Sequence, residues 1–145
     1  MYRYSDKQVM MPHEFFLPFG GKLNPENRWC KFARVVPWKE AEEKYAKNFN
    51  SGNAGKVAHP VRMALGSLII QNYKALSDRE TVEEITENPY LQFFIGLPGF
   101  VDKAPFNASL MVRFRKRLGR DIVDQISEML KSPKKSKGGK IVQSR

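Results

Sequence analysis

The sequence predicts an all-α fold, a compact bundle of about six helices. Apolar residues recur at three- and four-residue steps along most of the chain, and no segment alternates apolar and polar residues over the length of a strand. Residues that favour helix starts stand at the beginning of these periodic segments. The 145 residues, 41% of them apolar, are enough for one hydrophobic core, so a single helical domain is expected.

Three regions are expected along the chain. Residues 1–23 predict an N-terminal arm, because prolines and a Gly-Gly pair interrupt any helix there. The aromatic side chains of the arm are expected to anchor it to the body: Phe15, Phe16 and Phe19. Residues 24–130 are predicted to form the helical domain. Residues 131–145 carry six Lys and Arg and no acid, which predicts a disordered basic tail.

The first two helices are marked by prolines. An Asn-Pro pair predicts a helix over 24–35, because Asn caps helices well and Pro is tolerated at the first helical position. Pro37 ends this helix and opens a second one over 37–50. Trp29 and Trp38 fall on the apolar faces of these helices, so both are predicted to lie in the core.

The next three helices are marked by their starts. Residues 60–76 are apolar almost all round, which predicts a helix in the middle of the bundle. Ser77 and Glu80 form a capping box that predicts a helix over 77–87. A second Asn-Pro pair predicts a short helix over 88–97.

The last helix is expected over 107–130, with an apolar face and a basic face. With Met111 at zero and about 100° per residue, an apolar stripe falls within about 60° of that line: Phe114, Leu118, Ile122, Ile126 and Met129. Four cations fall on the opposite side, and we call them the basic ridge: Arg113, Lys116, Arg117 and Arg120. Arg115 falls inside the apolar stripe, where it either extends past the bundle edge or pairs with a buried carboxylate.

The charge of the chain favours a polyanionic partner. It has 25 Lys and Arg against 15 Asp and Glu, a net charge of +10, which favours nucleic acid first and an anionic membrane second. One cysteine excludes a disulfide-stapled secreted scaffold. The polar first ten residues predict no signal peptide, and the apolar stretch 63–73 is too short to span a bilayer. We expect a cytoplasmic, nucleoid-associated protein with no membrane partner.

The basic ridge is the predicted DNA contact. Segment 77–87 holds five acids and one arginine, so a helix-turn-helix made of 60–76 and 77–87 would press an acidic face against phosphates. The ridge could neutralise about four phosphates, and its arginines could read guanine in a major groove. The further DNA-binding candidates are Arg115 and three lysines of the tail: Lys134, Lys135 and Lys137.

The sequence predicts no catalytic, cofactor or metal site. Cys30 could pair with His13 or His59 as nucleophile and base, but no acid is spaced to orient either histidine. No His, Cys or Asp cluster has the spacing of metal ligands. Residues 50–59 are rich in Gly and Asn but lack the phosphate-loop pattern, so a surface loop is expected there. No small-molecule substrate is expected.

Four segments of the chain follow one another in a recognisable order and spacing: LPFGGKLNPENRW (17–29), HPVRMALGSLII (59–70), LSDRETVEEITENPYLQFFIGL (76–97) and APFNASLMVRFRKRL (104–118). In these segments the chain resembles the N-terminal domain of InsH-type bacterial insertion-sequence transposases. The portions NPYLQFFIGL and PFxxSLMVRFRKR are the most diagnostic. The resemblance covers about residues 15–130.

The resemblance implies a role in DNA transposition. In that family the helical region precedes an RNase-H-like domain whose Asp-Asp-Glu triad holds two divalent metals, and the helical region binds the terminal inverted repeats. We therefore expect a DNA-binding domain, truncated before the catalytic domain and not itself an enzyme, with no cofactor in this chain. Its expected partners are double-stranded transposon ends and either itself or a full-length transposase.

One alternative stays open from the sequence. The acidic segment 77–87 and the aromatic segment 88–97 could instead form a protein–protein module for dimerisation or synapsis, without DNA affinity of its own.

Overall fold

The computed structural model describes residues 11–47 and 60–131. In this part a short 3-10 helix, η1 (Pro12–Glu14), precedes seven α-helices. They are α1 (Arg28–Val35), α2 (Trp38–Lys47), α3 (Val61–Lys74), α4 (Asp78–Glu87), α5 (Pro89–Phe94), α6 (Leu110–Leu118) and α7 (Arg120–Lys131). The described residues contain no strand, and the all-α prediction is confirmed.

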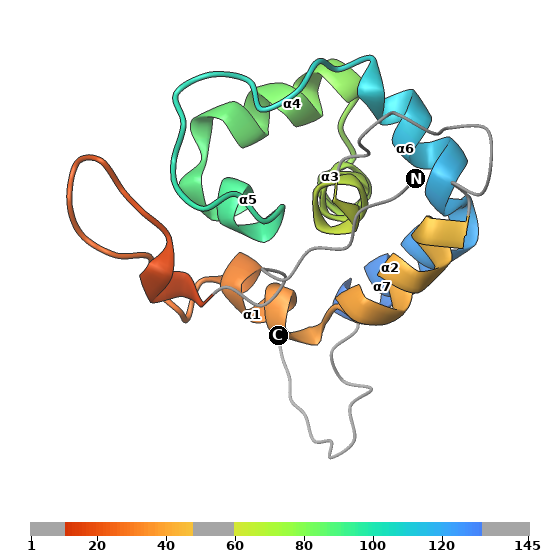
Figure 1. Cartoon of the computed structure of the whole chain (residues 1–145), viewed down its shortest axis with the longest axis horizontal. Helices are drawn as coiled ribbons and strands as arrows, with labels where there is room; N and C mark the ends of the chain where they lie inside the picture. The colour runs from red at the N-terminus through yellow and green to blue at the C-terminus, as the bar shows by residue number, and fades with distance from the viewer. Residues whose placement is uncertain (1–10, 48–59, 132–145) are drawn as a thin grey trace.

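Helix α3 is the centre of the bundle, as its apolar circumference predicts. Every residue from 61 to 70 is buried, and α3 packs against α2, α4, α5, α6 and α7. Figure 1 shows α3 end-on with the other helices around it. A Cβ on Gly66 would lie 3.1 Å from Cγ2 of Ile95, so a glycine here lets α3 approach the end of α5 closely.

The predicted starts of α4 and α5 are confirmed by their hydrogen bonds. Ser77 Oγ accepts from the Glu80 amide at 3.0 Å, and Glu80 Oε1 accepts from the Ser77 amide at 2.9 Å. These two bonds form the capping box. Asn88 Oδ1 accepts from the Tyr90 amide at 2.8 Å and caps α5.

Helix α1 begins three residues later than the sequence predicts. Asn24 Oδ1 accepts a hydrogen bond from the Glu26 amide at 2.9 Å, so the Asn-Pro pair forms a turn. Asn27 then caps α1 by accepting from the Trp29 amide. The prediction for the tryptophans is confirmed, since Trp29 and Trp38 are each 6% exposed.

The single long helix predicted over 107–130 is wrong. Gly119, with φ 81° and ψ 158°, divides it into α6 and α7. Met129 was expected in the apolar stripe and is 40% exposed. The buried residues of α7 are Val123, Ile126, Ser127 and Leu130. The buried face of α7 is therefore turned by about one residue from the face that a continuous helix would bury.

The N-terminal arm is fixed mainly by Phe15. This side chain is 2% exposed, and its ring meets that of Phe93 edge-on with centroids 6.1 Å apart. The backbone of Phe16 forms an isolated parallel bridge with Gly99. The side chains of Phe16 and Phe19 are 65% and 70% exposed, and the Phe19 ring meets that of Phe100 edge-on with centroids 6.0 Å apart, so these two side chains are less buried than the sequence predicts.

A buried arginine joins α3 to the end of α5. Arg62 is 3% exposed, and it donates from Nε to the Phe94 carbonyl at 2.9 Å and from Nη2 to the Phe93 carbonyl at 3.0 Å. Its guanidinium carbon lies 4.9 Å from the centroid of a Trp38 ring. Burial lowers the pKa of Arg62 to about 10, so the group stays protonated at neutral pH.

Candidate nucleic-acid interface

Helix α6 places apolar and basic side chains on different sides, as the sequence predicts. Met111 and Phe114 are 0% and 2% exposed in the core. The basic ridge lies outside: Arg113, Lys116 and Arg120 are exposed, and Arg117 is half-buried. Arg120 belongs to α7, not to the helix that carries the other three, so the ridge spans the break at Gly119.

Three cations of the ridge are available to an external anion. No described residue forms an ion pair or a side-chain hydrogen bond with Arg113, Lys116 or Arg120. The segment from Lys103 to Arg120 has six Lys and Arg and no acid. Such a run of one sign gives a local positive potential that attracts polyanions.

Arg115 is held by α4 instead. Its Nη1 and Nη2 donate to Oδ1 and Oδ2 of Asp78 at 2.8 and 3.0 Å, and Nη1 also donates to Gln71 Oε1 at 3.2 Å. Gln71 Nε2 donates to Asp78 Oδ1 at 2.7 Å and closes the network. Of the two alternatives for Arg115, pairing with a carboxylate is the one observed. That carboxylate is 32% exposed rather than buried.

This network sets the charge state of Asp78. The hydrogen bond from Arg115 lowers the pKa of Asp78, although partial burial acts in the opposite direction. The same bond raises the pKa of Arg115. The pair therefore remains charged over the whole neutral range and ties α6 to the start of α4.

Replacing Arg115 by Gln is expected to reduce stability in a pH-dependent way. The loss should be about 1 kcal/mol or less at pH 7, because both partners are partly solvated. In the folded protein the pKa of Asp78 lies below its unfolded value of about 3.9. The stabilisation is therefore complete above that value and is lost as the pH falls through the folded pKa. Urea denaturation at neutral and strongly acidic pH measures this.

The matched control for this change is Arg113→Gln, which removes one exposed charge from the same helix. It should alter the free energy of unfolding by less than about 0.5 kcal/mol at either pH. An equal loss for the two variants at neutral pH would contradict the stabilising role of the Arg115–Asp78 pair.

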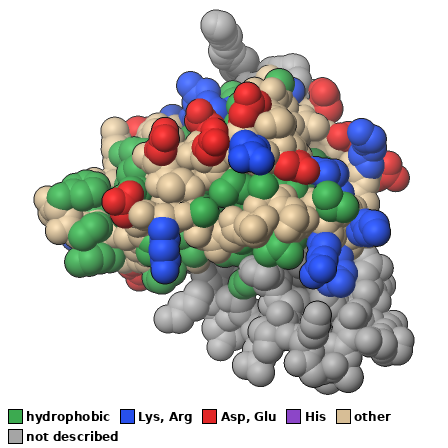
Figure 2. All heavy atoms as spheres, turned by 90° about the horizontal axis from the view of Figure 1, so that it is seen from above, with side chains coloured by type: hydrophobic (Ala, Val, Ile, Leu, Met, Phe, Trp, Pro, Cys, Tyr) green, Lys and Arg blue, Asp and Glu red, His purple; other side chains and the backbone are tan. Residues whose placement is uncertain are grey.

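The acidic side chains of α4 lie away from the ridge residues of α6, although Asp121 and Asp124 are exposed near Arg120 on α7. The exposed or half-buried acids of α4 are Asp78, Glu80, Glu83, Glu84 and Glu87. Figure 2 shows acidic side chains gathered over α4, whereas Lys and Arg side chains lie among Asp and Glu toward the end of the molecule where α6 lies. Apolar side chains gather at the opposite end, over the arm. A polyanion would therefore meet repulsion over α4 and attraction along α6.

Some of the remaining candidate site residues lie outside the described part of the chain, and the others are Cys30 and His13. His59, the loop 50–59 and three tail lysines lie outside the described residues: Lys134, Lys135 and Lys137. Cys30 is 1% exposed, and burial raises the pKa of its thiol, which favours a protonated, packed side chain. His13 is exposed on η1.

The described residues contain neither a candidate metal site nor a membrane-spanning helix. Over residues 11–47 and 60–131, no three His, Cys, Asp or Glu side chains are grouped so that they could hold a metal ion. The helices of these two segments are all too short or too polar to cross a membrane.

Comparison with known proteins places this all-α domain in a family. The sequence model of Transposase domain (DUF772) matches residues 18–117, well over half of the chain. The chain therefore belongs to the DUF772 transposase-domain family.

A curated relative is also similar to the chain. It is the uncharacterized protein ORF8 in the nfe locus of Rhizobium meliloti, which is 34% identical over 104 residues. The match covers 72% of this chain and 49% of the relative, so the chain spans about half the length of the curated relative that it matches. No solved structure matches the chain.

Proposed function

We propose that this domain binds double-stranded DNA at the terminal inverted repeats of an insertion sequence of the InsH type. The observation that carries the proposal is the basic ridge: three exposed cations without a described partner project from α6 and the start of α7. Membership in a transposase-domain family makes DNA the appropriate polyanion. Lys and Arg contacts to phosphates supply most of the affinity of such interfaces.

The fold supports the ridge as the contact surface. Met111 and Phe114 fix α6 against the core, so the cations project from a rigid helix and not from a loop. Arg115 adds a second attachment, through Asp78. A rigid cationic helix can follow a phosphate backbone or enter a major groove, where arginine forks onto guanine O6 and N7.

In this proposal the chain supplies DNA recognition. The phosphodiester chemistry of transposition, with its divalent metals, belongs to an Asp-Asp-Glu catalytic domain, as in the family that the sequence resembles. A second copy, or a transposase that carries such a domain, is the proposed protein partner.

Neutralising the ridge is expected to weaken DNA binding by about 10- to 100-fold. The variant Arg113→Gln, Lys116→Gln, Arg120→Gln removes up to three phosphate contacts, so its salt slope should fall by about 0.9 per lost contact. Fluorescence anisotropy over a salt series measures both quantities. The probes are duplexes made from the DNA segments that flank the reading frame and a duplex of scrambled sequence.

The matched control removes three exposed cations from α1, which lies across α3 from α6 (Figure 1). This variant, Arg28→Gln, Lys31→Gln, Arg34→Gln, has the same net charge and should bind DNA within about threefold of the wild type. Equal losses in the two variants would show that only total charge matters, and the ridge assignment would be wrong. Concentration-dependent dimers without affinity for any duplex would favour the protein–protein module instead.

A further inference from the structure

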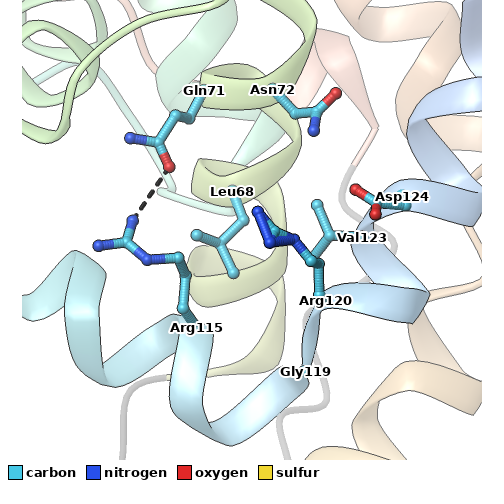
Figure 3. A pocket seen from close by; sticks show the side chains of 8 residues that line it. All are labelled: Leu68, Gln71, Asn72, Arg115, Gly119, Arg120, Val123 and Asp124. Atoms are coloured by element: carbon cyan, nitrogen blue, oxygen red, sulfur yellow. Dashed lines mark hydrogen bonds between the residues drawn. The ribbon is translucent and has the colours of Figure 1, made fainter.

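A cavity opens beside the basic ridge, where the break at Gly119 separates α6 from α7. Its volume is about 370 Å³, which is within the range of small-ligand pockets, about 300–1,000 Å³. Helix α3 forms one wall and the ends of α6 and α7 form the other (Figure 3). The lining residues are Leu68, Gln71, Asn72, Arg115, Gly119, Arg120, Val123 and Asp124.

The lining combines an apolar floor with polar groups at the rim. Leu68 and Val123 are 3% and 7% exposed and form the floor. Three exposed polar side chains stand around it, and none has a hydrogen-bond or ion-pair partner among the described residues: Asn72, Arg120 and Asp124. Gln71 and Arg115 are already engaged with Asp78, which makes that side of the cavity rigid.

We propose that this cavity receives one unpaired nucleobase of the bound DNA. The inference rests on the proposed function, because it requires DNA along the basic ridge, and Arg120 belongs to both surfaces. A base that leaves the DNA double helix is recognised by proteins in two ways: by hydrogen bonds to its edge, and by stacking on apolar side chains or on the plane of an arginine guanidinium. The cavity offers each of these: a floor of Leu68 and Val123, the Arg120 guanidinium, and two polar groups for the edge.

The chemistry of the cavity favours a base over a phosphate. The Asp124 carboxylate would repel a phosphate, whereas it can accept hydrogen bonds from the amino group of adenine, cytosine or guanine. The Asn72 amide both donates and accepts, so it can complete the contact with either edge. The buried apolar floor has no favourable interaction to offer a phosphate. The preferred occupant is therefore a base with an amino group, and guanine presents the larger donor edge.

The test compares two duplexes of the same sequence, one fully paired and one with a single extra guanine on one strand. The wild-type protein should bind the bulged duplex about tenfold more tightly, the discrimination of one good edge contact. The variant Asn72→Ala, Asp124→Ala should lose this preference, while its affinity for the paired duplex should not fall. Gln125→Ala, Glu128→Ala is the matched control, since both residues are exposed on α7 outside the cavity and one of them is acidic.

The possible outcomes separate this inference from the proposed function. Equal wild-type affinity for both duplexes would overturn the cavity assignment and leave the ridge as a DNA contact. A preference that survives in Asn72→Ala, Asp124→Ala would place the bulged base elsewhere and would also overturn the assignment. Binding of neither duplex would contradict the proposed function itself. Loss of the preference in this variant alone would support the cavity.

Discussion

Replacing Arg62 by Ala is expected to reduce the free energy of unfolding by about 3–5 kcal/mol. The side chain is 3% exposed and donates to the Phe93 and Phe94 carbonyls at the end of α5. Its loss would leave the Phe94 carbonyl without a donor among the described residues, and a buried unpaired carbonyl costs about 1–3 kcal/mol. A cavity beside Trp38 and the lost cation–π contact add to this.

Urea denaturation followed by tryptophan fluorescence measures the loss, since Trp29 and Trp38 are both buried in the folded state. Arg62→Lys tests the mechanism. It keeps the charge but has no planar fork for two carbonyls, so its stability should fall between those of the wild type and the alanine variant. Arg79→Ala, on the exposed face of α4, should change stability by less than about 0.5 kcal/mol. A loss below about 1 kcal/mol for Arg62→Ala would contradict the structural role assigned to this side chain.

Replacing Gly119 by Ala is expected to cost about 1–3 kcal/mol through the backbone alone. At φ 81° and ψ 158°, the residue lies in a region that only glycine occupies readily. A Cβ at this position would meet nothing within 4 Å, so crowding does not contribute. The strain could be relieved only by moving α7 relative to α6, and that would displace Arg120 from the ridge.

The control for Gly119 is D-alanine at the same position, introduced by semisynthesis. It adds the same methyl group but accepts a positive φ, so it should retain wild-type stability. Chemical denaturation of the three proteins gives the comparison. If L-alanine proved as stable as glycine, the break between α6 and α7 would not depend on the backbone freedom of residue 119.

Local signals account for the elements that the sequence predicted well. The capping box at Ser77 and the Asn88 cap each satisfy amides within a few residues, so the starts of α4 and α5 depend on neighbouring side chains alone. The burial of α3 follows from its composition, since no face of it could be exposed to water cheaply.

The break at Gly119 could not be predicted in the same way. Ile122 and Ile126 continue the apolar period from α6, and one glycine in a helix costs only about 1 kcal/mol, so a continuous helix fitted the pattern. The break is determined by tertiary packing. Helix α7 buries Val123 and Leu130 against the bundle, and this requires its axis to turn away from that of α6.

The long-range partners of charged residues could not be predicted from the sequence either. Arg62 stands in an apolar segment, and nothing near it indicates that its acceptors lie 31 and 32 residues later. The partner of Arg115 lies 37 residues earlier on α4. By contrast, the exposure of Arg113 and Lys116 followed directly from helical spacing, because α6 is regular over those residues. Their contact with DNA stays a prediction.

The bridge between Phe16 and Gly99 bears on where the chain can be cut or extended. The segment after Gly99 leads into α6. The bridge to Phe16 therefore fixes the start of the connection to this basic helix. A Cβ at Gly99 would lie 2.8 Å from the Cβ of Phe16, so the two backbone segments approach each other closely here. Removing the amino end through Phe16 would break both hydrogen bonds of this bridge, and the segment that leads into α6 would lose that support.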